Sequence, residues 1–285
     1  MADVRQSPEY AKFIKSLGWQ VEKMGEDQVF IKKIPLLGSL IKIQRAHSLD
    51  FNKIEDLARK HHAFQIIIEP ATIPPNISYP SNYRPLKSPY IPTKTLVLDL
   101  NKSEQAIFES FSKNKRRDIL LSERKGVVVK EGEIEDFVNL KKQYLWQKFI
   151  FPIGVKRDLV LLKQAFVSKA KVLLAYFENK PVAGTLLLFS GKTAYYWQAA
   201  ATSIGKKTLA PTALVWEAIK RAKKQGFLVF DFEGIADPRY PEQNSWKGFT
   251  HFKKGFRGTE ITYPQPFFTL AVLPRLRQLL DQAKK

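Results

Sequence analysis

The order of helical and extended segments between residues 126 and 235 constrains the fold more than any other feature of the chain. A short apolar strand at 126–132 precedes two helical segments, at 135–149 and 158–170. Three β-rich segments follow in close succession, and a long helix then leads into the apolar segment FLVFDFEGI at 227–235. Short strands joined by tight turns are typical of an antiparallel meander, whereas a strand, a helix and a strand in series predict a crossover. The residues therefore predict a mixed α/β unit.

This order resembles that of acyltransferases of the acetyltransferase superfamily. The first third of the chain repeats it in a reduced form: a helix at 8–19 with Ser7 as its cap, two strands around PLLGS, a helix at 50–62 and the strand FQIIIEP. A proline-rich loop at 70–92 and the strand KTLVLDL follow, and one helix is predicted over 102–126, with the change of domain inside it near Lys113. The predicted fold class is thus α/β (α+β), with two tandem acetyltransferase-like domains at 1–113 and 114–259.

Composition restricts the partners of the chain. It carries 47 Lys and Arg against 27 Asp and Glu, a formal net charge of +20, which favours nucleic acid, phosphorylated metabolites or an anionic membrane surface. The absence of cysteine excludes disulfides, thiolate zinc sites and a cysteine nucleophile. Because the chain has no signal core and no apolar run near ~20 residues, we expect a cytoplasmic protein.

The segment before the long helix, SIGKKTLAPTAL, occupies the place where acetyltransferases bind the pyrophosphate of coenzyme A. That site needs closely spaced glycines, because backbone amides must approach the phosphates. Here Gly205 stands alone before Lys206 and Lys207. Coenzyme A binding is therefore disfavoured, and the two lysines either contact a phosphate of a different ligand or lie in a solvated loop.

Two other polar clusters leave alternatives open. The helix at 113–126 is rich in cations, among them Arg116 and Arg117, and is either a solvated face or a track for nucleic-acid phosphates. Glu233 and Asp237, near the end of the last strand of the crossover, could act as bases or orient a ligand, or else cap the strand end. The four histidines show no metal-ligand spacing.

The segment SWKGFTHFKKGFRG, residues 245–258, threads aromatic rings with cations and lies in a stretch without acidic residues. At 100° per residue, Phe249, Phe252 and Phe256 fall on one side of a helix, and Lys247 and Lys254 fall on the other. Lys253 lies on the aromatic stripe, about 20° from Trp246. Its ammonium group therefore either passes the rings to reach water or points into a cleft, where it could serve an anion or a developing negative charge.

The same residues carry a resemblance to the Fem-type nonribosomal peptidyltransferases (FemA, FemB and FemX). The matching segments span nearly the whole chain, from RQSPEYAKFIKSLGW, LIKIQRAHSLD and TLVLDLNKS to LAPTALVWEAIKRAKKQG, and the pair FDFEGI and WKGFTHFKKGF is the specific one. The resemblance implies two acetyltransferase-like domains, with residues 260–285 returning to complete the first. The chain lacks the long helical-hairpin insertion of FemA and is similar to the compact FemX plan.

The resemblance also implies a reaction. Such enzymes move an aminoacyl group from aminoacyl-tRNA to an amino group of the peptidoglycan stem peptide, on a UDP-linked precursor (UDP-MurNAc-peptide) or on lipid II. No cofactor is expected beyond the aminoacyl-tRNA co-substrate. The implied protein is a cytoplasmic monomer. We expect its amphipathic, basic tail, LAVLPRLRQLLDQAKK, to form a helix that packs on the first domain, with weak contact to the inner face of the membrane as an alternative.

The resemblance assigns site residues with several departures from the family pattern. Phe252 and Lys253 match a Phe-Lys pair at the reaction centre, facing the tRNA end. Lys247, Lys254 and Arg257, with Arg116 and Arg117, are the implied tRNA contacts. On the acceptor side, two tyrosines of the family correspond to Tyr196 and Gln198, and a Thr and an Arg of the family correspond to Lys156 and Arg157. A phosphate-binding lysine of the family corresponds to Val21, with Lys23 nearby, and an Asp of the family corresponds to Glu69. Lys206 and Lys207 complete the predicted acceptor site.

Two further functions compete with this hypothesis. An acyl-CoA N-acyltransferase would share the fold class, and a non-catalytic RNA-binding protein would use the charge alone. Saturable acetyl-CoA binding would favour the first, and equal binding of charged and uncharged tRNA would favour the second.

Overall fold

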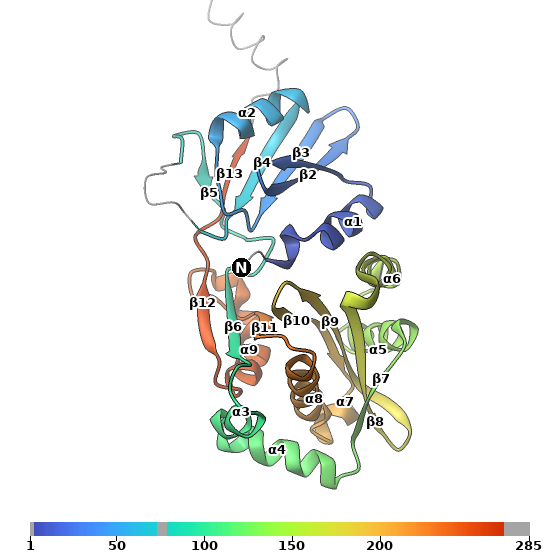
Figure 1. The fold of residues 1–285 in the computed structure, drawn as a ribbon. Coiled ribbons are helices and arrows are strands. Elements are labelled where there is room, and N and C mark those ends of the chain that lie inside the picture. The colour runs from blue at the N-terminus through green and yellow to red at the C-terminus, as the bar shows by residue number, and fades with distance from the viewer. Residues whose placement is uncertain (1–2, 73–78, 271–285) are drawn as a thin grey trace, which may run out of the picture. The chain divides into compact units, whose positions relative to one another are not determined.

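The computed structural model describes residues 3–72 and 79–270, which form two compact units, and each unit contains one mixed sheet (Figure 1). The larger unit spans residues 94–262, and the smaller one contains the described residues up to Thr93 together with 263–270. The predicted α/β class is therefore confirmed. The boundary differs from the expected 113/114, because the strand and helices of residues 94–124 pack in the larger unit. The returning segment begins at Tyr263, after residues 259–262 have paired in the larger unit.

The smaller unit is a six-stranded sheet in the order β1-β2-β3-β4-β13-β5. β3 and β4 are parallel and are connected through α2, whereas the other neighbours are antiparallel. Its elements are η1 (Val4–Gln6), α1 (Pro8–Ser16), β1 (Gln20–Met24), β2 (Asp27–Ile34), β3 (Gly38–Gln44), α2 (Phe51–Lys60), β4 (Ala63–Glu69), β5 (Arg84–Pro85) and β13 (Phe267–Leu270).

Local signals explain most of these elements. The Ser7 hydroxyl accepts a hydrogen bond from the amide of Tyr10 at 3.1 Å, and Pro8 occupies the first helical position, so α1 begins where the sequence predicts. Strand β1 was not predicted, because QVEKM lacks a clear apolar alternation. It forms by antiparallel pairing with β2 across a tight turn that contains Gly25 at a φ of 64°.

The larger unit is a seven-stranded sheet in the order β12-β6-β11-β10-β9-β8-β7, in which β10 and β11 form the parallel pair. Its strands are β6 (Lys94–Asp99), β7 (Val128–Glu131), β8 (Ala170–Phe177), β9 (Lys180–Ser190), β10 (Thr193–Ala201), β11 (Val229–Gly234) and β12 (Thr259–Thr262). Its helices are α3 (Glu104–Ser110), α4 (Lys113–Arg124), α5 (Ile134–Trp146), α6 (Val155–Phe166), η2 (Val167–Lys169), α7 (Ser203–Lys207), α8 (Ala210–Lys224), η3 (Pro241–Trp246) and α9 (Lys247–Lys254).

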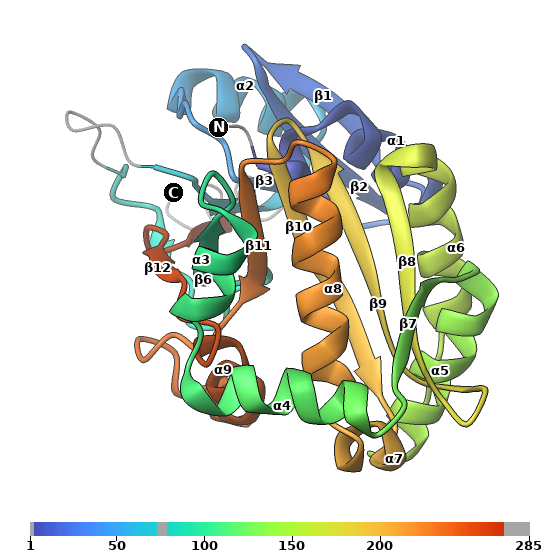
Figure 2. The same cartoon turned by 60° about the horizontal axis from the view of Figure 1, so that its bottom comes forward.

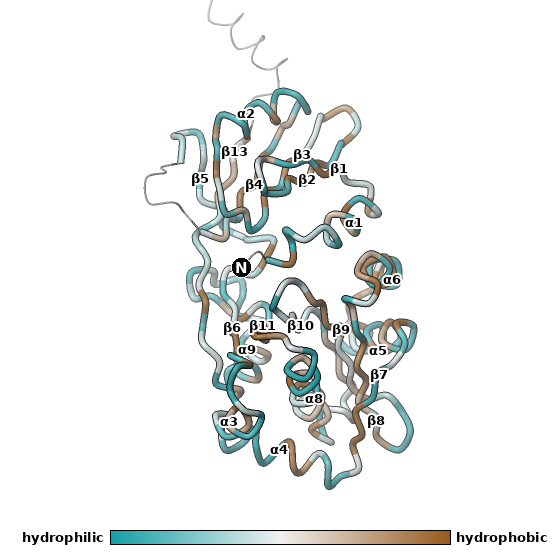
Figure 3. The backbone as a smooth tube through the Cα atoms, viewed as in Figure 1, coloured by the Kyte–Doolittle hydropathy of each residue, from teal (hydrophilic) through white to brown (hydrophobic). Residues whose placement is uncertain are grey.

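Helices cover both faces of this sheet, with α8 on one face and α5 and α6 toward the other (Figure 2). Alternate residues of β8 serve the two sides: Leu173 packs in the cluster that contains α8, whereas Leu174 packs against Gly184 on the α5 side. Figure 3 accordingly colours β8 mostly brown. A strand that is buried on both faces is apolar throughout, which is why its position was predictable.

The single helix predicted over 102–126 is wrong, because α3 and α4 are separated at Phe111 and Ser112. Phe111 is extended, with a ψ of 157°, and its ring packs edge-on against Trp216 and Phe256. The Ser112 hydroxyl then caps α4 by accepting from the Lys115 amide at 3.3 Å. Burial of one aromatic ring thus interrupts a segment of good helix formers.

Three findings complete the fold. The late basic segment is not one continuous helix, because η3 ends at Trp246 and α9 covers only Lys247–Lys254. The predicted tail helix and part of the proline-rich loop lie outside the described residues. Among residues 3–72 and 79–270, no helix is long and apolar enough to span a bilayer, and no cluster of side chains has the composition of a metal site.

Candidate active site

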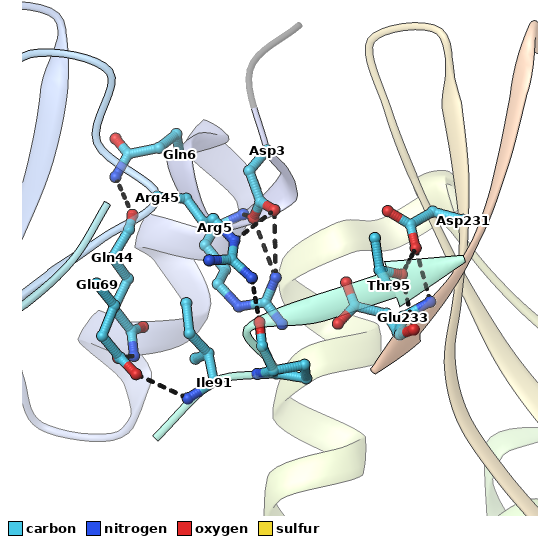
Figure 4. Close-up of polar contacts among 11 residues, drawn as sticks. Asp3, Arg5, Gln6, Gln44, Arg45, Glu69, Ile91, Thr95, Asp231 and Glu233 are labelled. Carbon is cyan, nitrogen blue, oxygen red and sulfur yellow. Dashed lines mark hydrogen bonds and ion pairs between the residues drawn. The ribbon is translucent and has the colours of Figure 1, made fainter. Parts of the chain in front are cut away.

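Strand β11 ends in an irregular segment that gathers polar groups of the larger unit. Its pairing with β6 shifts between Asp231 and Gly234, and Glu233 has a φ of 59°. One carboxylate oxygen of Asp231 lies 2.5 Å from the Thr95 hydroxyl and accepts from the Glu233 amide at 2.7 Å (Figure 4). This network fixes the strand end in a conformation that a regular strand would not adopt.

Lys253 of α9 points to this strand end. Its ammonium group donates a hydrogen bond of 2.6 Å to the carbonyl of Gly234, and the Phe249 ring lies 5.0 Å away. The side chain as a whole is partly exposed, but the ammonium end is enclosed. Burial lowers the pKa of Lys253 to about 8, although the charges of Glu233 and Asp231 act in the opposite direction. The ammonium is therefore poised to lose its proton near physiological pH.

The position of α9 is set by contacts on both sides of Lys253. The Thr250 hydroxyl accepts from the Ala236 amide at 2.8 Å, which ties the helix to the segment after β11. Phe256 is fully buried and packs against Phe232 and Phe111. These anchors fix the segment that carries Lys253, so its ammonium group can be held in one place.

A second enclosed lysine, Lys115 of α4, belongs to the same neighbourhood. Its ammonium lies 3.9 Å from the centre of the Phe252 ring and 3.5 Å from the Thr212 hydroxyl at the start of α8. Burial lowers its pKa to about 8. Lys115 lies in the cation-rich helix at 113–126, where the sequence did not predict this role, although helical spacing puts it on the same side as the buried Ile119 and Ser122.

A third lysine was also missed by sequence reasoning. Lys141 of α5 donates to the carbonyl of Ala199, near the end of β10, at 3.2 Å, and burial lowers its pKa to about 8. No motif surrounds it in the sequence. Its only signal is a cation on the face of α5 that carries the buried Phe137 and Val138.

The two predicted acceptor residues of β10 differ in environment. Tyr196 is buried between Phe230 and Phe232, and burial raises the pKa of its phenol well above the usual range. Gln198 lies on the other side of a shift in the pairing with β9 and is partly exposed. Tyr196 is thus part of the core, whereas Gln198 is accessible.

The remaining predicted acceptor cations of the larger unit are exposed. Lys156 and Arg157 lie in the first turn of α6, where Arg157 contacts Asp158 at 3.2 Å. Lys206 and Lys207 lie in α7. Gly205 of the same segment packs so closely that an added Cβ would lie 2.2 Å from the Val182 carbonyl oxygen, so this glycine serves the contact with β9.

The smaller unit holds the other two predicted acceptor residues. Lys23 is exposed on β1. Glu69 is buried, and its carboxylate accepts from the amides of Tyr90 and Ile91 at 2.8 and 2.9 Å and from the Gln44 side chain at 2.9 Å (Figure 4). These contacts give Glu69 a structural role, because they join β3, β4 and the segment before β6.

The predicted tRNA contacts are surface cations with few strong partners. Lys247, Lys254, Arg257 and Arg117 are exposed, and Arg116 is partly exposed. Lys254 pairs with Glu260 at 2.6 Å, and Arg117 with Asp118 at 2.9 Å. Asp237, an alternative acid from the sequence, is buried and pairs with Arg239 at 2.6 Å, which indicates a structural role.

The site can now be compared with known proteins. A family model, described as the FemAB family, matches part of the second half of the chain, and the match includes the whole of α9. Residues 163–281 match the FemAB family. The predicted resemblance to Fem-type proteins is thereby confirmed. No curated protein matches the chain.

Solved structures extend the similarity to FemX over the full length of the chain. A crystal structure of FemX matches with a TM-score of 0.78 and 15% identity, over 99% of this chain and 95% of that one. The structure of L-PGS from Bacillus licheniformis matches with a TM-score of 0.61 and 12% identity, over 99% and 96%. The C-terminal domain of a putative lysylphosphatidylglycerol synthetase from Agrobacterium fabrum gives 0.63 and 12%, over 98% and 92%. At these identities the matches establish the fold alone, which is a FemX-like arrangement of two mixed sheets.

Proposed function

We propose that this protein is an aminoacyltransferase that moves an amino acid from aminoacyl-tRNA to a stem-peptide amino group of a peptidoglycan precursor. The product would be a branch or cross-bridge of the cell wall. The FemAB match of residues 163–281 and the FemX fold support the class of enzyme. The single observation that carries the proposal is the enclosed ammonium of Lys253 at the irregular end of β11.

The reaction needs charge stabilisation more than a covalent intermediate. The acceptor amine attacks the ester carbonyl of the aminoacyl-tRNA, the new C–N bond forms, and the C–O bond to the terminal ribose breaks. Negative charge develops first on the carbonyl oxygen and then on the ribose oxygen, which must take a proton, while the attacking nitrogen loses one proton as the amide forms. An enclosed ammonium is suited to both tasks, because a low dielectric strengthens its interaction with an oxyanion and a pKa of about 8 permits proton transfer.

We propose that Phe252 and Lys115 assist Lys253 by holding groups in place at the reaction centre. The Lys115 ammonium lies against the Phe252 ring, next to Lys253 in the chain, so it holds the aromatic partner of the Phe-Lys pair. It also adds positive charge beside the start of α8, where the charge of Asp118 acts on it. We infer that Phe252 faces the terminal nucleotide and that Lys115 is a positioning residue for it.

The substrate contacts remain part of the proposal. We propose that six exposed or partly exposed residues bind the acceptor, whose diphosphate is anionic: Gln198, Lys156, Arg157, Lys206, Lys207 and Lys23. We propose that five cations bind tRNA phosphates: Lys247, Lys254, Arg257, Arg116 and Arg117. The formal charge of the whole chain, +20, supports binding to RNA that weakens as the salt concentration rises. The buried Tyr196 is proposed to support the site within the larger unit rather than to touch the acceptor, and the buried Glu69 is proposed to support the acceptor-binding residues of the smaller unit.

The test is transfer of a labelled amino acid from charged tRNA to three acceptors in parallel: a UDP-linked precursor, lipid II and phosphatidylglycerol. We expect label in one of the first two, detected as a heavier muropeptide by mass spectrometry. Label in phosphatidylglycerol instead would point to the reaction that the name lysylphosphatidylglycerol synthetase describes. If the label never leaves the tRNA while acetyl-CoA binds saturably, the protein is an acyl-CoA N-acyltransferase and the proposal is wrong.

A further inference from the structure

The connection between α5 and α6 exposes an unusual amount of apolar surface. In the segment 146–153, Phe149 is 95% exposed, Ile153 90%, Phe151 71%, Trp146 53% and Ile150 49%. Scattered single apolar residues are normal on a protein surface, but here five lie within eight consecutive positions, and the rings of Trp146 and Phe151 are in contact, with their centres 5.1 Å apart. We name residues 146–153 the apolar loop.

Backbone geometry presents this loop in a strained form. The amide of Ile150 donates to the carbonyl of Leu145, and the amide of Phe149 to that of Trp146, both at 3.0 Å, which is the Schellman pattern at the end of α5. Phe149 occupies its left-handed position with a φ of 57°, where glycine is favoured. The chain thus keeps a bulky, almost fully exposed ring at a position where glycine would be less strained. Strain retained without a packing benefit indicates a function outside the folded unit.

Charges around the apolar loop identify the partner. Between Asp136 and Asp158 the sequence contains no acidic residue and five cations: Lys141, Lys142, Lys148, Lys156 and Arg157. Lys148 lies within the loop, and Lys156 and Arg157 follow it in the first turn of α6, all three exposed. A group of large apolar side chains bordered by cations is typical of segments that insert into the interface of an anionic bilayer.

We propose that the apolar loop docks this protein on an anionic lipid surface, with Phe149, Phe151 and Ile153 inserted among the acyl chains and the flanking cations at the headgroups. A single-stranded nucleic acid fits less well, because bases stack on aromatic rings, whereas two of the five exposed side chains are isoleucines without a π face. If the proposed transfer is correct, docking would bring the enzyme to the surface that carries a lipid-linked acceptor. That consequence rests on the proposed function, but the lipid binding itself does not.

Vesicle flotation with the full-length protein, without tRNA or acceptor, tests the docking. Vesicles of phosphatidylcholine with phosphatidylglycerol, and vesicles of phosphatidylcholine alone, are compared for the wild type and for the variant Phe149→Ser/Phe151→Ser/Ile153→Ser. We expect the wild type to bind the anionic vesicles and the triple variant to bind at least about tenfold more weakly. Ile204→Ser is the matched control: Ile204 is 54% exposed beside Lys206 and Lys207 but lies alone, so its removal should leave binding unchanged.

A second variant separates lipid binding from folding. Phe149→Gly removes the most exposed ring and relieves the left-handed strain, so it should raise the unfolding temperature and still weaken vesicle binding. The proposal is overturned if the wild type does not bind anionic vesicles, or if the triple variant binds them as well as the wild type. It is also overturned if these changes abolish self-association or tRNA binding and leave vesicle binding intact. None of these outcomes depends on aminoacyl transfer. Transfer is measured separately, in an assay with the soluble UDP-linked precursor as acceptor.

Discussion

Lys253 combines a cost to folding with the catalytic role that we propose for it. Its ordinary pKa of 10.5 falls to about 8 in the folded protein, so below pH 8 the fold holds a charge that the unfolded chain would solvate better. The sequence identified this residue because helical geometry separates it from Lys247 and Lys254. The sequence could not give its partner, because Gly234 is 19 positions away and meets Lys253 only through the irregular end of β11.

Replacement of this charge should stabilise the protein. Lys253→Met keeps the volume of the side chain and removes the enclosed ammonium, so we expect a gain of about 2 kcal/mol in the free energy of unfolding at pH 7. Because the pKa is lowered in the folded protein, the enclosed charge destabilises the wild type fully below pH 8. The difference in free energy of unfolding between the wild type and Lys253→Met shrinks as the pH rises toward 10.5, where the unfolded lysine also loses its proton. Urea denaturation at pH 7 and pH 10 measures both values. A loss of stability at pH 7 would contradict the enclosed ammonium.

The pH dependence of transfer gives a second test at this residue. If the protonated form of Lys253 assists the reaction, its contribution is lost as the pH rises through about 8. Lys253→Arg keeps its charge at every accessible pH, so the ratio of wild-type to Lys253→Arg kcat should fall above pH 8. The ratio cancels the titration of the acceptor amine and the hydrolysis of the ester. A constant ratio from pH 6.5 to 9 would exclude a role for this proton.

Lys115 shows where residue-level reasoning failed. A cation within a run of cations is normally predicted to be solvated, and only the helical spacing of Lys115 to Ile119 and Ser122 indicates that it lies on the buried side of α4. Its proximity to Phe252 required the fold, because α4 and α9 are far apart in the sequence and meet where Ser112 donates its amide to the carbonyl of Gly255 at 2.9 Å.

At the scale of elements, the break between α3 and α4 positions both enclosed lysines. Ser112→Ala removes the side-chain cap of α4, so we expect a loss of about 1 kcal/mol in the free energy of unfolding, measured by urea denaturation. Because the cap also fixes the turn of α4 that carries Lys115, transfer should fall as well. Ser112→Asp retains a capping oxygen and should restore most of the stability. Equal stability of the wild type and Ser112→Ala would show that the cap is dispensable.

Most other elements were predictable, because their signals are local. Ser7, Pro8 and the apolar spacing define α1, and the continuous apolar character of β8 defines a strand buried on both faces. The misplaced elements depend on distant contacts. Strand β1 needs its pairing with β2, and the end of α3 needs the packing of Phe111 against Trp216 and Phe256.

At the scale of the whole molecule, the class of fold was predictable and the boundary was not. Composition shifts near Lys113, but β6 pairs with β11 and β12, which assigns residues 94–112 to the larger unit. The catalytic proposal therefore lies within one unit, where β11, α4, α8 and α9 supply Lys253 and its neighbours. The formal charge of +20 extends over the whole chain and supports a polyanionic substrate without naming it.

The central claim is that the ammonium of Lys253 stabilises the transition state of aminoacyl transfer. Its most direct test is single-turnover transfer from charged tRNA by Lys253→Ala, compared with Lys224→Ala, which removes one exposed positive charge at the end of α8. We predict that Lys253→Ala lowers the transfer rate by about a hundredfold or more at saturating tRNA, with the fold intact, and that Lys224→Ala does not change it. A folded Lys253→Ala protein that transfers at the wild-type rate would show that Lys253 does not have this role.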